Sequence, residues 1–135
     1  MKKQILLLLV LVSIGCISYA QKANTAVVTN LSAERFKAII ANDKTGDAVL
    51  DLRTTEEIMS KGYIKGAIQL DFLAKDAEKQ IDKLDKNKTY YIYCASGGRS
   101  SDCATYMEKH DFKRVYTLEK GFSDWASKGM PVEKK

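Results

Sequence analysis

The amino-acid sequence predicts a single α/β domain built on a mostly parallel sheet. First, its length of 135 residues suits one domain. Second, short apolar segments rich in β-branched and aromatic residues alternate with segments of helical periodicity, and this alternation is typical of a parallel sheet. Third, hydrophobic residues make up 45% of the chain and charged residues 29%, which excludes a disordered or collagen-like protein.

The first twenty residues have the layout of a secretory signal peptide. Lys2 and Lys3 precede an apolar run from Ile5 to Val12, and small residues precede a cleavage position after Ala20. We therefore expect a signal peptide at 1–20, a lead-in at 21–30 and one domain at 31–135. Such a leader predicts an exported protein, with the periplasm as its destination.

Two alternatives to cleavage after Ala20 stay open. Cys16 follows Ser-Ile-Gly, which resembles a lipoprotein box, so a lipid anchor at Cys16 is one of them. A retained anchor is the other, but Ile5 to Ala20 is shorter than the ~20 residues that span a bilayer. Loss of Lys2 and Lys3 reduces the formal charge from +5 to +3, which gives no reason to expect nucleic acid as a partner.

The domain is predicted to begin with a helix and a buried strand. Leu31 and Ser32 form a hydrophobic residue followed by an N-cap, and the next apolar residues recur at helical spacing as far as Asn42. The apolar segment 48–52 predicts a buried strand. In the lead-in, Val27-Val28 suggests a further short strand.

Alternating elements are predicted along the rest of the chain. They are a short strand at 67–70, a charged surface helix at 71–84, a strand at 89–93, a helix at 100–109, a strand at 115–118 and a helix at 121–128. The strand at 89–93 has the clearest pattern, because all its residues are β-branched or aromatic.

A cysteine stands where this strand would end. Cys94 is followed by Ala95, Ser96, Gly97, Gly98, Arg99 and Ser100, and residues 94–100 are called the Cys94 loop below. Backbone N–H groups of such a loop, the N-terminus of the next helix and the Arg99 charge would all lower the pKa of the thiol. The alternative is that Cys94 is a buried, inert hydrophobic residue.

Four motifs in this order resemble the rhodanese family of sulfurtransferases. They are Val49 to Arg53 with Glu57, Gly62 to Ala67, the Cys94 loop, and Gly121 to Val132. The resemblance covers about Leu31 to Val132, and it implies a central, mostly parallel sheet flanked by helices on both faces. The sequence departs from the family pattern at Tyr63, usually His, and at Asp111 and Lys120, usually Gly.

The resemblance also implies a mechanism. Cys94 would take a sulfur atom from a small anionic donor such as thiosulfate, as a persulfide held by the amides of the Cys94 loop. The acceptor would be cyanide, a small thiol or a protein thiol, and no cofactor or metal is expected. The two alternatives are a persulfide carrier or redox partner of another protein, and a rhodanese-fold binding module without catalysis.

The length of the loop separates two chemistries on this scaffold. Cys94 and Arg99 enclose four residues, whereas related phosphatases enclose five around the wider phosphate group. Phosphatases also commonly have His before the cysteine, where this chain has Tyr93. Sulfur transfer is therefore favoured over phosphate or arsenate chemistry.

Three further residues form a second tier of predicted pocket residues, namely Asp51, Arg53 and Glu57. Arg53 would hold an anionic donor or brace the loop through Glu57, but a structural ion pair with Asp51 is the favoured interpretation.

Cys103 is expected to be a core cysteine, with a resolving thiol as the alternative. Phe122 and Trp125 are expected in the core. His110, the one His of the sequence, is expected in solvent.

Overall fold

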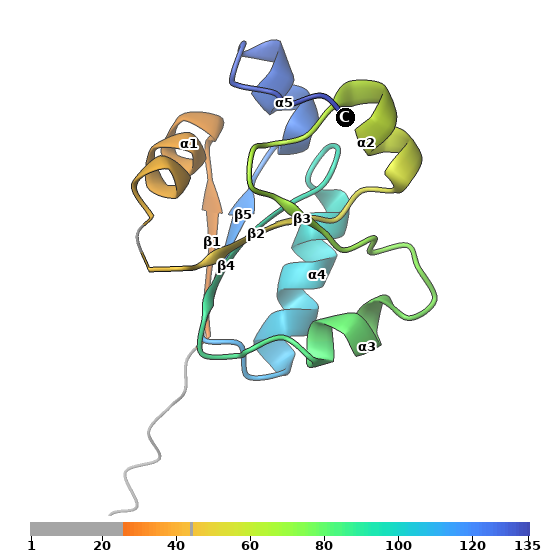
Figure 1. Ribbon diagram of the computed structural model, residues 1–135. Coiled ribbons are helices and arrows are strands. Elements are labelled where there is room, and N and C mark those ends of the chain that lie inside the picture. Colours follow the sequence, from red (N-terminus) through yellow and green to blue (C-terminus); the bar gives the residue numbers. More distant parts are fainter. Residues whose placement is uncertain (1–25, 44) are drawn as a thin grey trace, which may run out of the picture.

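The computed structural model describes residues 26–43 and 45–135 (Figure 1). The predicted signal peptide and the alternative lipid site at Cys16 lie outside the described residues. No helix within the described residues is long and apolar enough to cross a membrane.

Within residues 26–43 and 45–135 the sheet contains five strands in the order β1-β5-β4-β2-β3, and all its neighbouring strands are parallel. The strands are β1 (Val27–Leu31), β2 (Ala48–Asp51), β3 (Ile68–Gln69), β4 (Thr89–Tyr93) and β5 (Arg114–Leu118). The helices are α1 (Ala33–Asn42), α2 (Thr55–Lys61), α3 (Ala77–Asp82), α4 (Gly98–Lys109) and α5 (Gly121–Ser127). The predicted α/β class is confirmed.

Two hydrophobic clusters cover the two faces of the sheet, and alternate residues of β4 divide between them. Tyr90 and Ile92 pack with residues of α3 and α4, whereas Tyr91 and Tyr93 pack with residues of α1 and α5. Helices therefore lie on both faces, as Figure 1 shows for α1 and α4. Every residue of β4 is buried, because β4 has a strand on each side and a helical layer on each face.

Two elements are longer than their patterns suggested. β1 runs from Val27 to Leu31 and pairs with β5 along its whole length, although Val27 and Val28 are exposed. An exposed edge strand lacks the apolar alternation that identifies a strand in sequence. Helix α4 begins at Gly98, inside the Cys94 loop, two residues before the start predicted from the sequence.

The region 71–84 was predicted wrongly as one helix. Only Ala77–Asp82 is helical, and the residues before it form turns, one of which is closed by the Asp71 carboxylate accepting a hydrogen bond from Leu73 N (2.9 Å). Asp is suited to this role because its side chain binds the backbone amide two residues ahead. The charged composition of the segment does not distinguish a surface helix from such turns.

Candidate active site

Cys94 directly follows β4 at the carboxyl edge of the sheet. Its side chain is buried, with 1% of its surface exposed, and it packs in the cluster that also contains Cys103. Open parallel sheets place their ligand sites at this edge. The strand therefore fixes the sulfur at the position where the Cys94 loop turns into α4.

Backbone amides of the loop converge on this sulfur. Cys94 Sγ accepts hydrogen bonds from Gly97 N at 3.1 Å and from Ser100 N at 3.4 Å. The Ser100 hydroxyl lies 3.6 Å from Sγ and also donates to the Gly97 carbonyl at 3.0 Å. Gly97 has a φ of 104°, and a Cβ there would overlap the Glu119 carbonyl oxygen, so the turn requires glycine.

These contacts favour the thiolate form of Cys94. Burial alone raises the pKa of a thiol because it removes the charged form from water. Hydrogen bonds from Ser100, Gly97 and Ser96 act in the opposite direction, and the net result is a Cys94 pKa below the ordinary thiol value. The predicted lowering of the pKa is thus present, and backbone and hydroxyl groups are its main source.

Helix α5 holds the loop from the other side. Phe122 N donates to the Cys94 carbonyl at 2.8 Å, and Ser123 N donates to the Ala95 carbonyl at 3.0 Å. Gly121, with a φ of 67°, lies so close that a Cβ would sit 2.6 Å from the Ala95 carbonyl oxygen. The free N–H groups at the start of α5 therefore bind the loop carbonyls. Sequence reasoning missed this role, because it depends on a contact between distant segments.

Arg99 does not stand free in the loop. Its two terminal nitrogens donate to the two carboxylate oxygens of Glu57, at 2.8 and 2.7 Å. Glu57 also accepts a hydrogen bond from Thr54 N at 2.9 Å, and Thr54 caps α2 in return. The Arg99 hydrogen bond is the main reason why the pKa of Glu57 is lowered to about 2. The less favoured interpretation, in which Arg53 braces the loop through Glu57, does not match the structure, because Glu57 pairs with Arg99.

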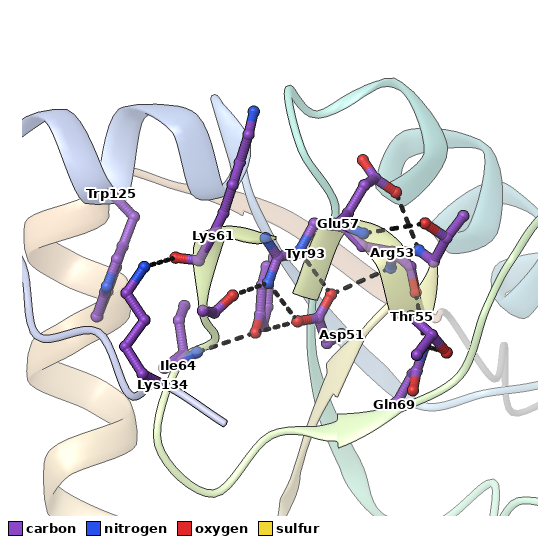
Figure 2. A network of polar contacts seen from close by, with 12 residues as sticks. Asp51, Arg53, Thr55, Glu57, Lys61, Ile64, Gln69, Tyr93, Trp125 and Lys134 are labelled. Carbon is purple, nitrogen blue, oxygen red and sulfur yellow. Dashed lines mark hydrogen bonds and ion pairs between the residues drawn. The ribbon is translucent and has the colours of Figure 1, made fainter. Parts of the chain in front are cut away.

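Arg53 and Asp51 form a buried ion pair beneath the site. Figure 2 shows this network, in which Arg53 binds both Asp51 oxygens, at 2.9 and 2.7 Å, and the Gly62 carbonyl at 2.7 Å. The Tyr93 hydroxyl donates to Asp51 at 2.6 Å, and the Phe122 ring lies 3.9 Å from the guanidinium carbon. These contacts agree with the favoured interpretation of a structural pair, since they join the ends of β2 and β4 to the C-cap of α2 and to α5. Arg53 Nη1 is buried without a hydrogen-bond partner among the described residues.

Comparisons with known proteins identify the family. The family model described as the rhodanese-like domain matches residues 32–128. The chain belongs to the rhodanese-like domain family.

Curated relatives of this rhodanese-like domain include proteins named for sulfur transfer. A protein named sulfurtransferase from Allochromatium vinosum is 31% identical over 107 residues, which cover 78% of this chain and 95% of that protein. YrkF of Bacillus subtilis, named as a candidate sulfur carrier, is 33% identical over 105 residues. This match covers 78% of the present chain but only 55% of YrkF.

Solved structures show the same architecture. A rhodanese-like domain protein from Staphylococcus aureus superposes with a TM-score of 0.65 at 25% identity, covering 78% of this chain and 99% of that one. A rhodanese-related protein from Thermoplasma volcanium gives a TM-score of 0.68 at 22% identity, covering 79% and 99%. The second likeness concerns the fold alone.

The other cysteine of this rhodanese-like domain is a core residue. Cys94 and Cys103 are both free thiols, and Cys103 is fully buried against the sheet. Burial is the main cause that raises the pKa of Cys103 to about 12. The geometry therefore fits the expected core cysteine, and the two thiols of the domain differ sharply in their tendency to ionise.

Predictions for the aromatic residues are mostly confirmed. Phe122 and Trp125 are buried in the core, as expected. His110, expected in solvent, is partly buried, and its ring stacks on Tyr106 with 3.9 Å between the ring centroids. The correction has a local cause, because positions four residues apart on a helix lie on the same face.

Proposed function

We propose that the protein is a sulfurtransferase that carries sulfur on Cys94 as a persulfide. The observation that carries this proposal is the position of Cys94 Sγ among the amides of Gly97 and Ser100, with a thiol pKa below its ordinary value. A thiolate is the nucleophilic form of cysteine, so such a site needs no separate base. Relatives named as sulfurtransferases support the same reaction class.

The proposed reaction has two steps. The Cys94 thiolate attacks the outer sulfur of thiosulfate, a sulfur–sulfur bond forms, and sulfite leaves with the electron pair of the bond that breaks. The persulfide anion on Cys94 then gives its outer sulfur to a thiolate or to cyanide, which regenerates the Cys94 thiolate. Charge and atoms balance in both steps, and neither step consumes an oxidant or reductant.

The shape of the loop suits the negative charge of the intermediate. The amides of Gly97 and Ser100 already bind the charge on Sγ, and the start of α4 adds the positive end of a helix dipole. Donors fixed in advance around a developing charge stabilise it without reorganisation. The loop has only four residues between Cys94 and Arg99, which suits one sulfur atom better than a phosphate group.

A persulfide carrier is the second candidate. Its support is the similarity to YrkF, and it shares the first step with the sulfurtransferase. The two differ in the acceptor, which is a protein thiol for a carrier and a small thiol or cyanide for a sulfurtransferase. We further propose that either activity takes place after export, since residues 1–20 have the layout of a signal peptide.

Intact-mass measurement after incubation with thiosulfate tests the proposal. We expect a gain of one sulfur atom in the wild-type chain and in Cys103→Ser, and no gain in Cys94→Ser. Addition of cyanide should remove the sulfur and release thiocyanate. A wild-type chain whose mass does not change, and whose Cys94 is alkylated only slowly, would contradict sulfur transfer and leave the binding-module alternative.

A further inference from the structure

Arg99 is the only charged residue of the Cys94 loop, yet its guanidinium is already bound to a carboxylate. The ion pair with Glu57 is partly shielded from water, with 20% and 30% of the two side chains exposed. Partial burial and two parallel hydrogen bonds make such a pair stronger than an ordinary surface pair. The cation that an anionic sulfur donor would use is therefore occupied in the free protein.

Glu57 is held in place independently of Arg99. It is the third residue of α2, and its carboxylate accepts the Thr54 amide hydrogen while the Thr54 hydroxyl accepts the Glu57 amide hydrogen. This reciprocal capping box fixes the carboxylate next to the loop. Because its pKa is lowered to about 2, Glu57 is ionised across the physiological range.

A second carboxylate adds to the negative charge around Arg99. The hydrogen-bonded Glu57 is the main cause that raises the pKa of Arg99, and the charges of Cys94 and Asp71 act in the same direction. Glu57 is thus the carboxylate bound to the guanidinium and Asp71 adds a smaller electrostatic attraction, while the donors that contact Sγ are neutral amides. A dianion such as thiosulfate would therefore meet an Arg99 charge that is already paired with a carboxylate.

We propose that Glu57 determines donor specificity by competing with anionic sulfur donors for Arg99. This inference rests on the proposed sulfur transfer at Cys94. A doubly charged donor binds the Arg99 guanidinium only when it displaces Glu57. Binding of a donor with lower charge depends less on the contact with Arg99. Glu57 therefore weakens the binding of small dianions relative to monoanionic or thiol-derived donors.

Steady-state kinetics with two donors of different charge test this specificity. The donors are thiosulfate, a dianion, and methanethiosulfonate, a monoanion that transfers the same outer sulfur. In Glu57→Gln we expect KM for thiosulfate to fall about threefold to tenfold, as for the loss of one partly exposed ion pair, and KM for methanethiosulfonate to fall less. Glutamine also serves in a capping box, so α2 should be retained.

Glu56→Gln is the matched control. Glu56 is the exposed neighbour of Glu57 on α2, so this variant removes the same charge from the same helix. We expect its KM values to equal those of the wild type. If Glu57→Gln instead raises KM, or lowers kcat equally for both donors, Glu57 only positions the loop and the proposal is wrong.

A binding experiment separates this inference from the proposed function. Sulfate is a dianion that donates no sulfur, so its protection of Cys94 against iodoacetamide measures anion binding alone. We expect protection at a lower sulfate concentration in Glu57→Gln than in Glu56→Gln or the wild type. Equal protection in all three would overturn the role of Glu57, whether or not a persulfide forms. Absence of persulfide with stronger protection in Glu57→Gln would reject sulfur transfer alone.

Discussion

At the residue scale, the groups that lower the pKa of Cys94 are mainly ones without formal charge. Gly97 N and Ser100 N contact the sulfur, whereas the nearby guanidinium of Arg99 is bound to Glu57. Amides that are fixed by the backbone lose no side-chain entropy when the thiolate forms. The arrangement therefore stabilises a thiolate even though burial opposes it.

The pH dependence of alkylation should distinguish the two cysteines. The pKa of Cys94 lies below the ordinary thiol value, so its reaction with iodoacetamide should have a midpoint below that of a free cysteine, about 8.5. Cys103, with a pKa raised to about 12, should react only after unfolding. Mass mapping of the labelled residue at each pH checks both expectations.

Loss of the Ser100 hydroxyl should weaken this effect without removing it. In Ser100→Ala the amide of residue 100 still contacts the sulfur, but the hydroxyl that lies 3.6 Å from Sγ is lost. We expect alkylation of Cys94 near neutral pH to slow about threefold to tenfold, the range for an ordinary hydrogen bond, because the contact is as long as 3.6 Å. An unchanged rate would show that the amides alone stabilise the thiolate.

Glu57 should make stability depend on acid pH. Its pKa is about 2 in the folded protein against an ordinary 4.5, so its contribution is complete above 4.5 and is lost as the pH falls toward 2. Because the carboxylate is partly exposed, we expect a contribution of only about 1 kcal/mol. Urea unfolding of the wild type and Glu57→Gln should differ by this amount at pH 6 and converge near pH 2. A constant difference would contradict the assignment.

Sequence reasoning identified Cys94 and its loop because strand, glycines and helix start are adjacent in the chain. It could not identify the partner of Arg99, because Glu57 lies 42 positions away. A pairing over such a distance depends on how β2 and β4 align in the sheet. Local pattern contains no information on this alignment.

At the element scale, α2 was missed although its first turn has a recognisable motif. Thr54 and Glu57 stand three residues apart, which is the spacing of a capping box. The helix has seven residues and only Ile58 is buried, so no apolar periodicity marks it. The capping box was therefore the one sequence signal that could have predicted this helix, because its hydrophobic residues show no helical pattern.

The contact between α5 and the loop makes Gly121 and Gly129 a matched pair for substitution. Both have positive φ, 67° and 68°, but a Cβ at Gly121 would strike the Ala95 peptide, whereas one at Gly129 would meet nothing within 4 Å. Gly129→Ala should cost about 1 kcal/mol through backbone strain. Gly121→Ala should cost about 2 kcal/mol more by overpacking.

Urea unfolding measures both costs, and alkylation of Cys94 reports on the loop. We expect Gly121→Ala to slow alkylation near neutral pH, because displacement of the Ala95 peptide moves the amides away from the sulfur. Gly129→Ala should leave the alkylation rate unchanged. Equal effects of the two substitutions on stability and rate would show that α5 does not hold the loop.

At the scale of the whole molecule, class and family were predictable, but strand order was not. Alternating strands and helices predicted a parallel sheet, and four motifs in sequence predicted the family. The order β1-β5-β4-β2-β3 depends on how the two faces of β4 are covered, and this requires three-dimensional packing. The edge strands β1 and β3 were the least visible because their side chains are largely exposed.

The proposed export of the chain predicts a defined mature N-terminus. Cleavage after Ala20 would leave Gln21 first and remove Cys16, so the mature protein would contain two cysteines. Mass spectrometry of the protein from the periplasmic fraction should show this terminus. A lipid-modified Cys16, or an intact Met1, would support one of the two alternatives instead.

The hydrogen bonds between α5 and the Cys94 loop also determine when the site can form during synthesis. Protein chains are made from the N-terminus, and Phe122 and Ser123, which bind the Cys94 and Ala95 carbonyls, follow the cysteine by nearly thirty residues. A nascent chain that has been synthesised only as far as α4 therefore lacks the α5 amides that bind the carbonyls of the Cys94 loop. The Cys94 loop therefore acquires both of its supports only after α5 has been synthesised and has packed against it.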